Sequence, residues 1–125
     1  MKLFKLLMVS LGLLISFTAR AGKADVITAE AICDHKQINR CNFQVTVRHA
    51  DAGWDHYADK WDIMTPDGKV IATRVLYHPH ENEQPFTRSL GNVIIDEDIR
   101  EVVIRAHDSV HGYGGETFTL AIPGR

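Results

Sequence analysis

The chain alternates apolar and polar residues over short stretches, and this period of two constrains its fold more than any other feature. In Cys41–Val47, CNFQVTV, the side chains of Cys41, Phe43, Val45 and Val47 share one face, and the other face is polar. Because successive side chains of a β-strand point to opposite sides, the pattern predicts a half-buried strand. No stretch repeats apolar residues convincingly at helical spacing, so we expect an all-β protein.

The same pattern predicts about seven short strands separated by turn signals. Thr65–Gly68, TPDG, is typical of a turn, because proline presets φ and glycine adopts left-handed backbone. About seven strands in roughly 100 residues predict an immunoglobulin-like or fibronectin-III-like β-sandwich, with a small barrel as the alternative. The other predicted strands are Val26–Cys33, Trp61–Met64, Lys69–Tyr77, Phe86–Leu90, Glu101–Ala106 and Glu116–Ile122.

Residues 1–21 have the pattern of a secretory signal peptide. They combine a basic start, an apolar run from Leu6 to Phe17 and the small-x-small triplet Ala19-Arg20-Ala21. The run is short for a bilayer span, and an uncleaved N-terminal anchor is the alternative. The run is not followed by a cysteine, which argues against a lipid-anchored form. We therefore expect a single β-sandwich domain over residues 22–125, periplasmic or secreted, with no membrane span after cleavage of the signal peptide.

The charge and cysteine content narrow the class of protein further. Without the predicted leader the chain has 11 Lys and Arg against 16 Asp and Glu, a formal charge of −5. It shows no basic patch, so nucleic acid is not an expected partner. Cys33 and Cys41 are the only cysteines, and in an oxidising compartment they predict a disulfide that closes a hairpin. The alternative, a pair of metal-binding thiolates, fits zinc-ligand spacings poorly.

Three predicted connections hold nearly all of the histidines. In a sandwich of antiparallel strands, the connections near His49–Lys60, His78–Pro85 and His107–Gly115 lie at the same end. His35 is expected at the opposite end. The six histidines in the three connections are His49, His56, His78, His80, His107 and His111.

This clustering predicts a metal site, because neutral imidazole is the commonest metal-binding side chain. Sites rich in nitrogen and poor in sulfur favour Cu(II), Zn(II) or Ni(II), so we expect copper or zinc as the bound ion. The proposed ligands are His78, His80, His107 and His111, with His56 and His49 as further candidates. The nearby carboxylates are expected to bind the ion or to accept the far ring N–H of a ligand histidine. They are Asp108, Glu81, Glu83 and Asp55.

Two other functions fit the same loops. Trp54, Tyr57 and Tyr113 could anchor a protein partner or a small ligand on a loop surface that holds no metal. A metal-activated water would make the protein a metal-dependent hydrolase. Ser89 and Ser109 lie in no known nucleophile motif, so we predict no catalytic residues.

Three strings resemble those of a family of small exported bacterial proteins. They are GWDHYADKW (53–61), HPHENEQPFTRSL (78–90) and AHDSVHGYGG (106–115), and the resemblance covers most of the predicted mature chain. It implies an exported protein. The family has no established activity, so the resemblance assigns no role to any residue.

Overall fold

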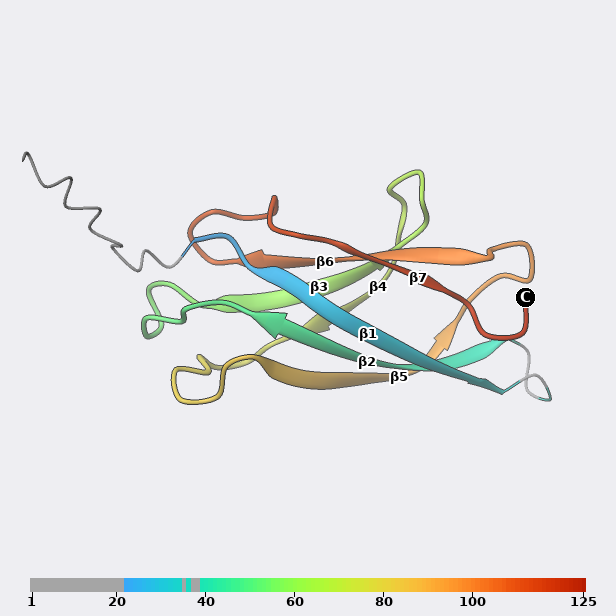
Figure 1. Cartoon of the computed structure of the whole chain (residues 1–125), viewed down its shortest axis with the longest axis horizontal. Helices are drawn as coiled ribbons and strands as arrows, with labels where there is room; N and C mark the ends of the chain where they lie inside the picture. The colour runs from blue at the N-terminus through green and yellow to red at the C-terminus, as the bar shows by residue number, and fades with distance from the viewer. Residues whose placement is uncertain (1–21, 35, 37–38) are drawn as a thin grey trace, which may run out of the picture.

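The computed structural model describes residues 22–34, 36 and 39–125, and the described part of the chain is built from seven β-strands (Figure 1). The predicted leader, residues 1–21, and His35 lie outside the described residues. The strands are β1 (Asp25–Asp34), β2 (Arg40–Arg48), β3 (Ala58–Met64), β4 (Val70–Val75), β5 (Phe86–Ile94), β6 (Glu101–Asp108) and β7 (Phe118–Ala121).

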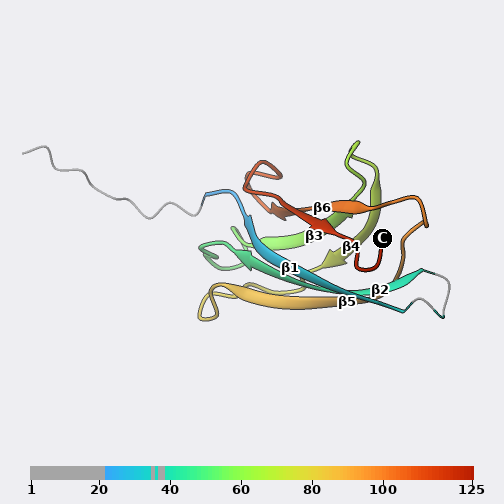
Figure 2. The same cartoon turned by 45° about the vertical axis from the view of Figure 1, so that its right-hand side comes forward.

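The strands form two antiparallel sheets that face each other as the layers of a sandwich (Figures 1 and 2). One sheet has the order β1-β2-β5 and the other has the order β4-β3-β6-β7. In the constant-type immunoglobulin order, the fourth strand would join the sheet of the first, second and fifth strands. Here β4 pairs with β3 instead. Seven strands in two facing sheets confirm the predicted all-β sandwich of about seven strands.

The core consists of the inward faces of both sheets, as the alternation predicts. Phe43, Val45 and Val47 of β2 and Trp61 and Ile63 of β3 are all fully buried. Complete burial of one apolar side chain of this size contributes about 1.5–3 kcal/mol to folding. Buried apolar residues of β1, β2, β3, β5 and β6 belong to one core cluster between the sheets.

The predicted disulfide is present and closes the β1–β2 hairpin. Cys33 and Cys41 are directly paired across the two strands, with their Cα atoms 4.0 Å apart. No free cysteine occurs in the described part of the chain. The thiolate alternative is thus excluded for these two residues in this structure.

Strand β5 runs to Ile94 and is longer than the prediction, which ended at Leu90. The reason is a β-bulge between β2 and β5, where the register shifts between Cys41 and Phe43. At the bulge Asn92 adopts a φ of 58°, and its N–H donates to Oδ1 of Asn42 at 2.9 Å. A bulge interrupts the period of two, so a strand that continues through one looks shorter in the sequence.

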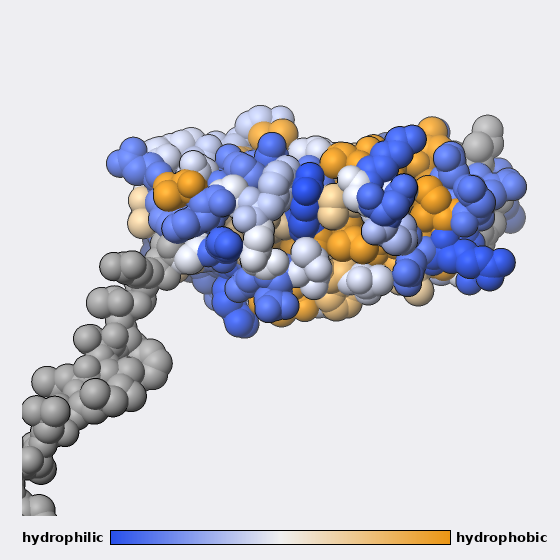
Figure 3. Space-filling view, turned by 90° about the horizontal axis from the view of Figure 1, so that it is seen from above, coloured by the Kyte–Doolittle hydropathy of each residue, from blue (hydrophilic) through white to orange (hydrophobic). Residues whose placement is uncertain are grey.

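The β2–β3, β4–β5 and β6–β7 connections lie together at one end of the sandwich, as predicted (Figure 1). Direct contacts join them: the N–H of His49 donates to Oε1 of Gln84, and the N–H of Tyr57 donates to Oγ of Ser109, both at 3.0 Å. On the face in Figure 3, the end where β1 begins is largely hydrophilic, and hydrophobic residues lie mostly in the middle and toward the opposite end. None of the described segments is a helix long and apolar enough to cross a membrane.

Candidate metal centre

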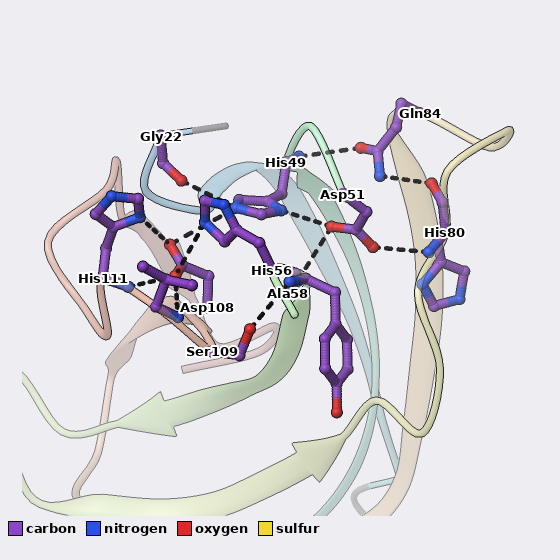
Figure 4. Close-up of polar contacts among 12 residues, drawn as sticks. Gly22, His49, Asp51, His56, Ala58, His80, Gln84, Asp108, Ser109 and His111 are labelled. Atoms are coloured by element: carbon purple, nitrogen blue, oxygen red, sulfur yellow. Dashed lines mark hydrogen bonds and ion pairs between the residues drawn. The ribbon is translucent and has the colours of Figure 1, made fainter. Parts of the chain in front are cut away.

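His49, His56 and Asp108 come together at the loop end of the sandwich (Figure 4). His49 directly follows β2, His56 lies in the β2–β3 connection, and Asp108 is the last residue of β6. One ligand atom from each of the three lies within 4.8 Å of the other two. His49 and Asp108 are buried and His56 is half-buried. This group, the His49–His56–Asp108 cluster, could hold a metal ion.

The carboxylate of Asp108 is fixed by its own loop. Its Oδ1 atom accepts the N–H groups of Val110 at 2.8 Å and His111 at 2.5 Å, and its backbone pairs with that of Gly112 through two 3.1 Å hydrogen bonds. Oδ2 is buried and has no hydrogen-bond partner among the described residues. An acceptor oxygen is thus held rigidly in the cluster with its lone pairs unused.

Asp108 is ionised although it is completely buried. Burial alone raises the pKa of its carboxyl group, but the N–H groups of His111 and Val110 and the charges of His49 and His111 outweigh that effect. The net pKa of Asp108 is therefore lower than its ordinary value. An ionised, desolvated carboxylate attracts cations strongly.

Three imidazole nitrogens surround this carboxylate at distances too long for good hydrogen bonds. Nε2 of His56 lies 3.4 Å from Oδ1, Nε2 of His49 lies 3.6 Å from Oδ2, and Nδ1 of His111 lies 3.3 Å from Oδ2. Two ligands bound tetrahedrally at about 2.0–2.1 Å from a zinc ion are about 3.3–3.4 Å apart. The nitrogen-to-oxygen distances are close to such an edge and long for hydrogen bonds, whereas the ligand atoms of the cluster as a whole lie within 4.8 Å of one another, so the side chains would have to close around an ion.

His49 is oriented by acceptors on both sides of its ring. Nδ1 lies 2.5 Å from Oδ1 of Asp51 and Nε2 lies 2.9 Å from the carbonyl oxygen of Gly22. A carboxylate and a carbonyl can only accept, so either ring nitrogen can donate to the oxygen that it faces. An ion bound at Nε2 would displace one proton and the contact with Gly22, while the Asp51 bond would hold the ring in place.

His56 occupies the middle of the cluster. Its ring centroid lies 4.8 Å from that of His49 and 4.8 Å from that of His111. Nε2 of His56 is buried and has no hydrogen-bond partner among the described residues. Leaving such a group unpaired costs about 1–3 kcal/mol, a cost that a bound ion would remove.

His78 and His80 lie apart from this cluster, in the β4–β5 connection. Their ring centroids are 4.5 Å apart, and the ring of His80 stacks on Phe86 at 4.1 Å. Burial lowers the pKa of His80, and the positive charges of Arg88 and His78 act in the same direction. The ring of His80 is therefore neutral near pH 7.

His107 also faces away from the cluster. It lies within β6 and not in the loop, and its Nδ1 is bonded to Oδ1 of Asp59 at 2.5 Å. Its ring packs edge-on against Tyr113, with centroids 4.7 Å apart. Of the four leading ligand candidates, the structure brings only His111 close to Asp108, where its ring is partly exposed at the rim.

The predicted carboxylates and aromatic residues are divided among different roles. Asp55 and Glu81 are exposed, and Glu83 is paired with Arg88 through two 3.1 Å hydrogen bonds. Trp54 is 66% exposed and its ring meets that of Tyr57 at 5.6 Å. Tyr113 is not part of this surface, because it packs beneath a guanidinium group.

That packing belongs to a buried network around Asp62, which the sequence analysis missed. Asp62 accepts hydrogen bonds from Thr73 at 2.6 Å, Tyr113 at 2.7 Å and Arg105 at 3.0 Å. The guanidinium carbon of Arg105 lies 3.6 Å from the centroid of the Tyr113 ring. The network fastens the β6–β7 connection, which follows Asp108, onto the sheet.

The sequence analysis also missed Asp51 and placed Asp108 outside the leading ligand set. A signal for the cluster was present in the alternation. His49 continues the inward series of β2 (Cys41, Phe43, Val45 and Val47), since it has the same parity and is buried. Asp108 likewise continues the buried series of β6. Polar residues at inward-facing positions at the ends of two strands therefore indicate the cluster, whereas the composition of the loops does not.

The comparisons with known proteins add limited information. No protein-family model and no solved structure matches the chain. A protein of Halomicrobium mukohataei named "Putative lipoprotein" is 42% identical over 78 residues, which are 62% of this chain. Those residues make up 38% of the relative, so the chain spans well under half of that protein's length. The name contains neither a ligand nor a reaction.

Proposed function

We propose that the protein binds a divalent transition metal, Zn(II) or Cu(II), at the His49–His56–Asp108 cluster. The observation that carries the proposal is the unpaired pair of buried atoms, Nε2 of His56 and Oδ2 of Asp108, beside the ring of His49. Two imidazole nitrogens and one carboxylate oxygen suit these ions, whereas calcium and magnesium prefer oxygen ligands. His111 could close over the bound ion, because its Nδ1 already lies 3.3 Å from the same carboxylate.

We further propose that the protein works outside the cytoplasm, as one domain over residues 22–125. Three observations support export: the leader pattern of residues 1–21, the Cys33–Cys41 disulfide and the name of the relative. Disulfides persist in oxidising compartments. An exported metal-binding protein of this kind would store, deliver or sense its ion.

Calorimetric titration tests the metal site directly. The protein, exported from the full chain, is stripped with a chelator and titrated with Zn(II) and with Cu(II). We expect binding tighter than about 10 μM. His56→Ala should lose at least about tenfold in affinity, the smallest loss typical of removing even an outer-shell partner. His107→Ala is the matched control, because this histidine lies at the same end but bonds Asp59. Wild-type affinity in His56→Ala would exclude the cluster as the site.

A second candidate function is recognition of a protein or small ligand by the loop surface without metal. The exposed ring of Trp54 favours it, since aromatic side chains of this kind anchor interfaces. The two functions differ in one measurement. Chelator-treated protein would keep its partner if the loop surface alone recognises it, and would lose it if the ion is required.

A further inference from the structure

A second group of side chains at the loop end is left unexplained by the cluster. The β4–β5 connection and the turn at Gly53 and Trp54 line a pocket of about 540 Å³ that is open to solvent. His78, His80 and Glu81 are among the residues that line it. None of these three belongs to the His49–His56–Asp108 cluster, which is the one group of the described residues whose ligand atoms already lie within 4.8 Å of one another.

The ring of His80 is held in place but its nitrogens are not used. Its backbone N–H donates to Oδ2 of Asp51 at 2.7 Å, and its carbonyl accepts from Nε2 of Gln84 at 2.9 Å. The ring lies between Phe86 and His78, and only 6% of the residue is exposed. Both ring nitrogens are buried without a hydrogen-bond partner among the described residues. Buried polar atoms are normally hydrogen-bonded, so an unpaired buried imidazole requires an explanation. An ion bound by the lone pair of a ring nitrogen would be such a partner.

His78 is placed to share such a ligand. It is exposed, its ring lies over that of His80, and its Nδ1 makes only a 3.2 Å contact with the carbonyl of Pro79. An exposed side chain changes rotamer easily, so this ring can turn its free nitrogen toward a ligand of His80. Two imidazoles separated by one residue are thus available on a single connection.

The carboxylate most available to complete the site is that of Glu81. Both oxygens of Glu83 are taken by Arg88, whereas Glu81 is exposed and forms no hydrogen bond or ion pair with the described residues. The positive charge of Arg88 repels a cation near His80, and the paired Glu83 carboxylate offsets only part of that repulsion. Oε1 of Glu81 lies 3.6 Å from the position that a Cβ on Gly53 would occupy, so Glu81 reaches across the pocket to the β2–β3 connection.

We propose that His78, His80 and Glu81 form a second site for a divalent transition metal, separate from the His49–His56–Asp108 cluster. Nitrogen-rich ligands favour Zn(II) or Cu(II) here as well. The two sites share one structural residue, Asp51, whose Oδ1 faces His49 and whose Oδ2 holds the backbone of His80. The second site does not depend on the first, since its ligands come from a different connection.

The test counts bound ions in the exported protein and two variants. Zn(II) and Cu(II) are titrated separately into wild type, His56→Ala and His80→Phe. We expect two ions on wild type and one on each variant. His80→Phe should also raise the melting temperature of the metal-free protein, because phenylalanine keeps the stack on Phe86 and removes two unpaired nitrogens. Wild-type stoichiometry and affinity in His80→Phe would overturn the second site.

Further variants separate the outcomes. His78→Ala changes an exposed ring and should weaken the second site at least about tenfold even if His80→Phe fails to fold. Glu97→Gln is the control, because this exposed carboxylate lies in the β5–β6 connection, and it should leave both sites unchanged. One ion that is lost in His56→Ala but kept in His80→Phe and His78→Ala would overturn the second site and support the cluster. The reverse pattern would support the second site and overturn the cluster.

Discussion

Asp51 holds the imidazole of His49 through a 2.5 Å hydrogen bond between its Oδ1 atom and Nδ1 of the ring, and both side chains are completely buried. The same oxygen accepts the N–H of Ala58 at 3.0 Å, and Oδ2 accepts the N–H of His80 at 2.7 Å. A carboxylate on Nδ1 directs Nε2 toward the metal in many histidine-ligated sites. Here Nε2 lies 2.9 Å from the carbonyl oxygen of Gly22 and 3.6 Å from Oδ2 of Asp108. Asp51 orients the ring and also ties the β2–β3 connection to the β4–β5 connection.

Asp51→Asn should weaken metal binding at the cluster by about 10–100-fold, as loss of such an acceptor typically does. The amide has a single acceptor oxygen for three donors, so the free energy of unfolding should fall by about 1–3 kcal/mol. Calorimetry and chemical denaturation measure the two effects. The matched control is Asp55→Asn, which changes an exposed carboxylate in the same connection. Equal losses of metal affinity in Asp51→Asn and Asp55→Asn would show that Asp51 does not orient a ligand of the cluster.

Asp62→Asn should destabilise the protein by about 2–4 kcal/mol at pH 7, because it leaves Arg105 without its buried partner. The comparison is made by urea denaturation, with the exposed Asp98→Asn as control.

The effect of Asp62 should also depend on pH in a defined direction. Burial raises its pKa, but hydrogen bonds from Thr73, Tyr113 and Arg105 outweigh burial, so the folded-state pKa lies below the ordinary value. A group with a depressed folded-state pKa stabilises above its unfolded pKa, about 3.9 for aspartate, and the contribution disappears as pH falls through the lower folded value. The difference in the free energy of unfolding between wild type and Asp62→Asn should therefore become smaller below about pH 4. A gap that stays constant down to pH 2 would contradict this assignment.

Removal of the disulfide should cost about 2.5 kcal/mol, the value that chain entropy predicts for a loop this short. The two cysteines are eight residues apart and pair directly across β1 and β2. The variant Cys33→Ala/Cys41→Ala should show the loss in denaturant, and dithiothreitol should produce a similar loss in wild type only. Equal midpoints for oxidised wild type and the double variant would show that the hairpin does not need the bond.

Gly115→Ala should displace the segment that precedes β1. A Cβ on Gly115 would lie 1.9 Å from the carbonyl oxygen of Ala24, so the backbone must move. We expect a loss of about 1–3 kcal/mol or more. The 2.8 Å bond from the N–H of Val26 to the carbonyl of Glu116 should also open, which hydrogen exchange at Val26 would detect. The exposed Thr117→Ala is the control, and unchanged exchange in Gly115→Ala would contradict the close packing.

The sequence alone determined the class of fold and indicated the end of the sandwich at which the candidate site lies. Alternation, β-branched runs and turn signals predicted seven strands, the two cysteines in an exported chain predicted the disulfide, and antiparallel order predicted that the histidine-rich connections lie at one end. These features are local or follow from topology, because the period of two is a property of the strand itself. The prediction ended β5 too early, at Leu90, because a bulge at Asn92 interrupts the alternation.

Only the tertiary structure decided which side chains meet. His107 and Asp108 are neighbours in the chain, yet the pleat turns His107 outward to Asp59 and Asp108 inward to His49 and His56. The sequence contains six histidines within three connections, but the direction of each ring depends on hydrogen bonds between those connections. The bond from the N–H of His80 to Asp51, for example, joins residues from two different connections, and spacing along the chain does not encode it.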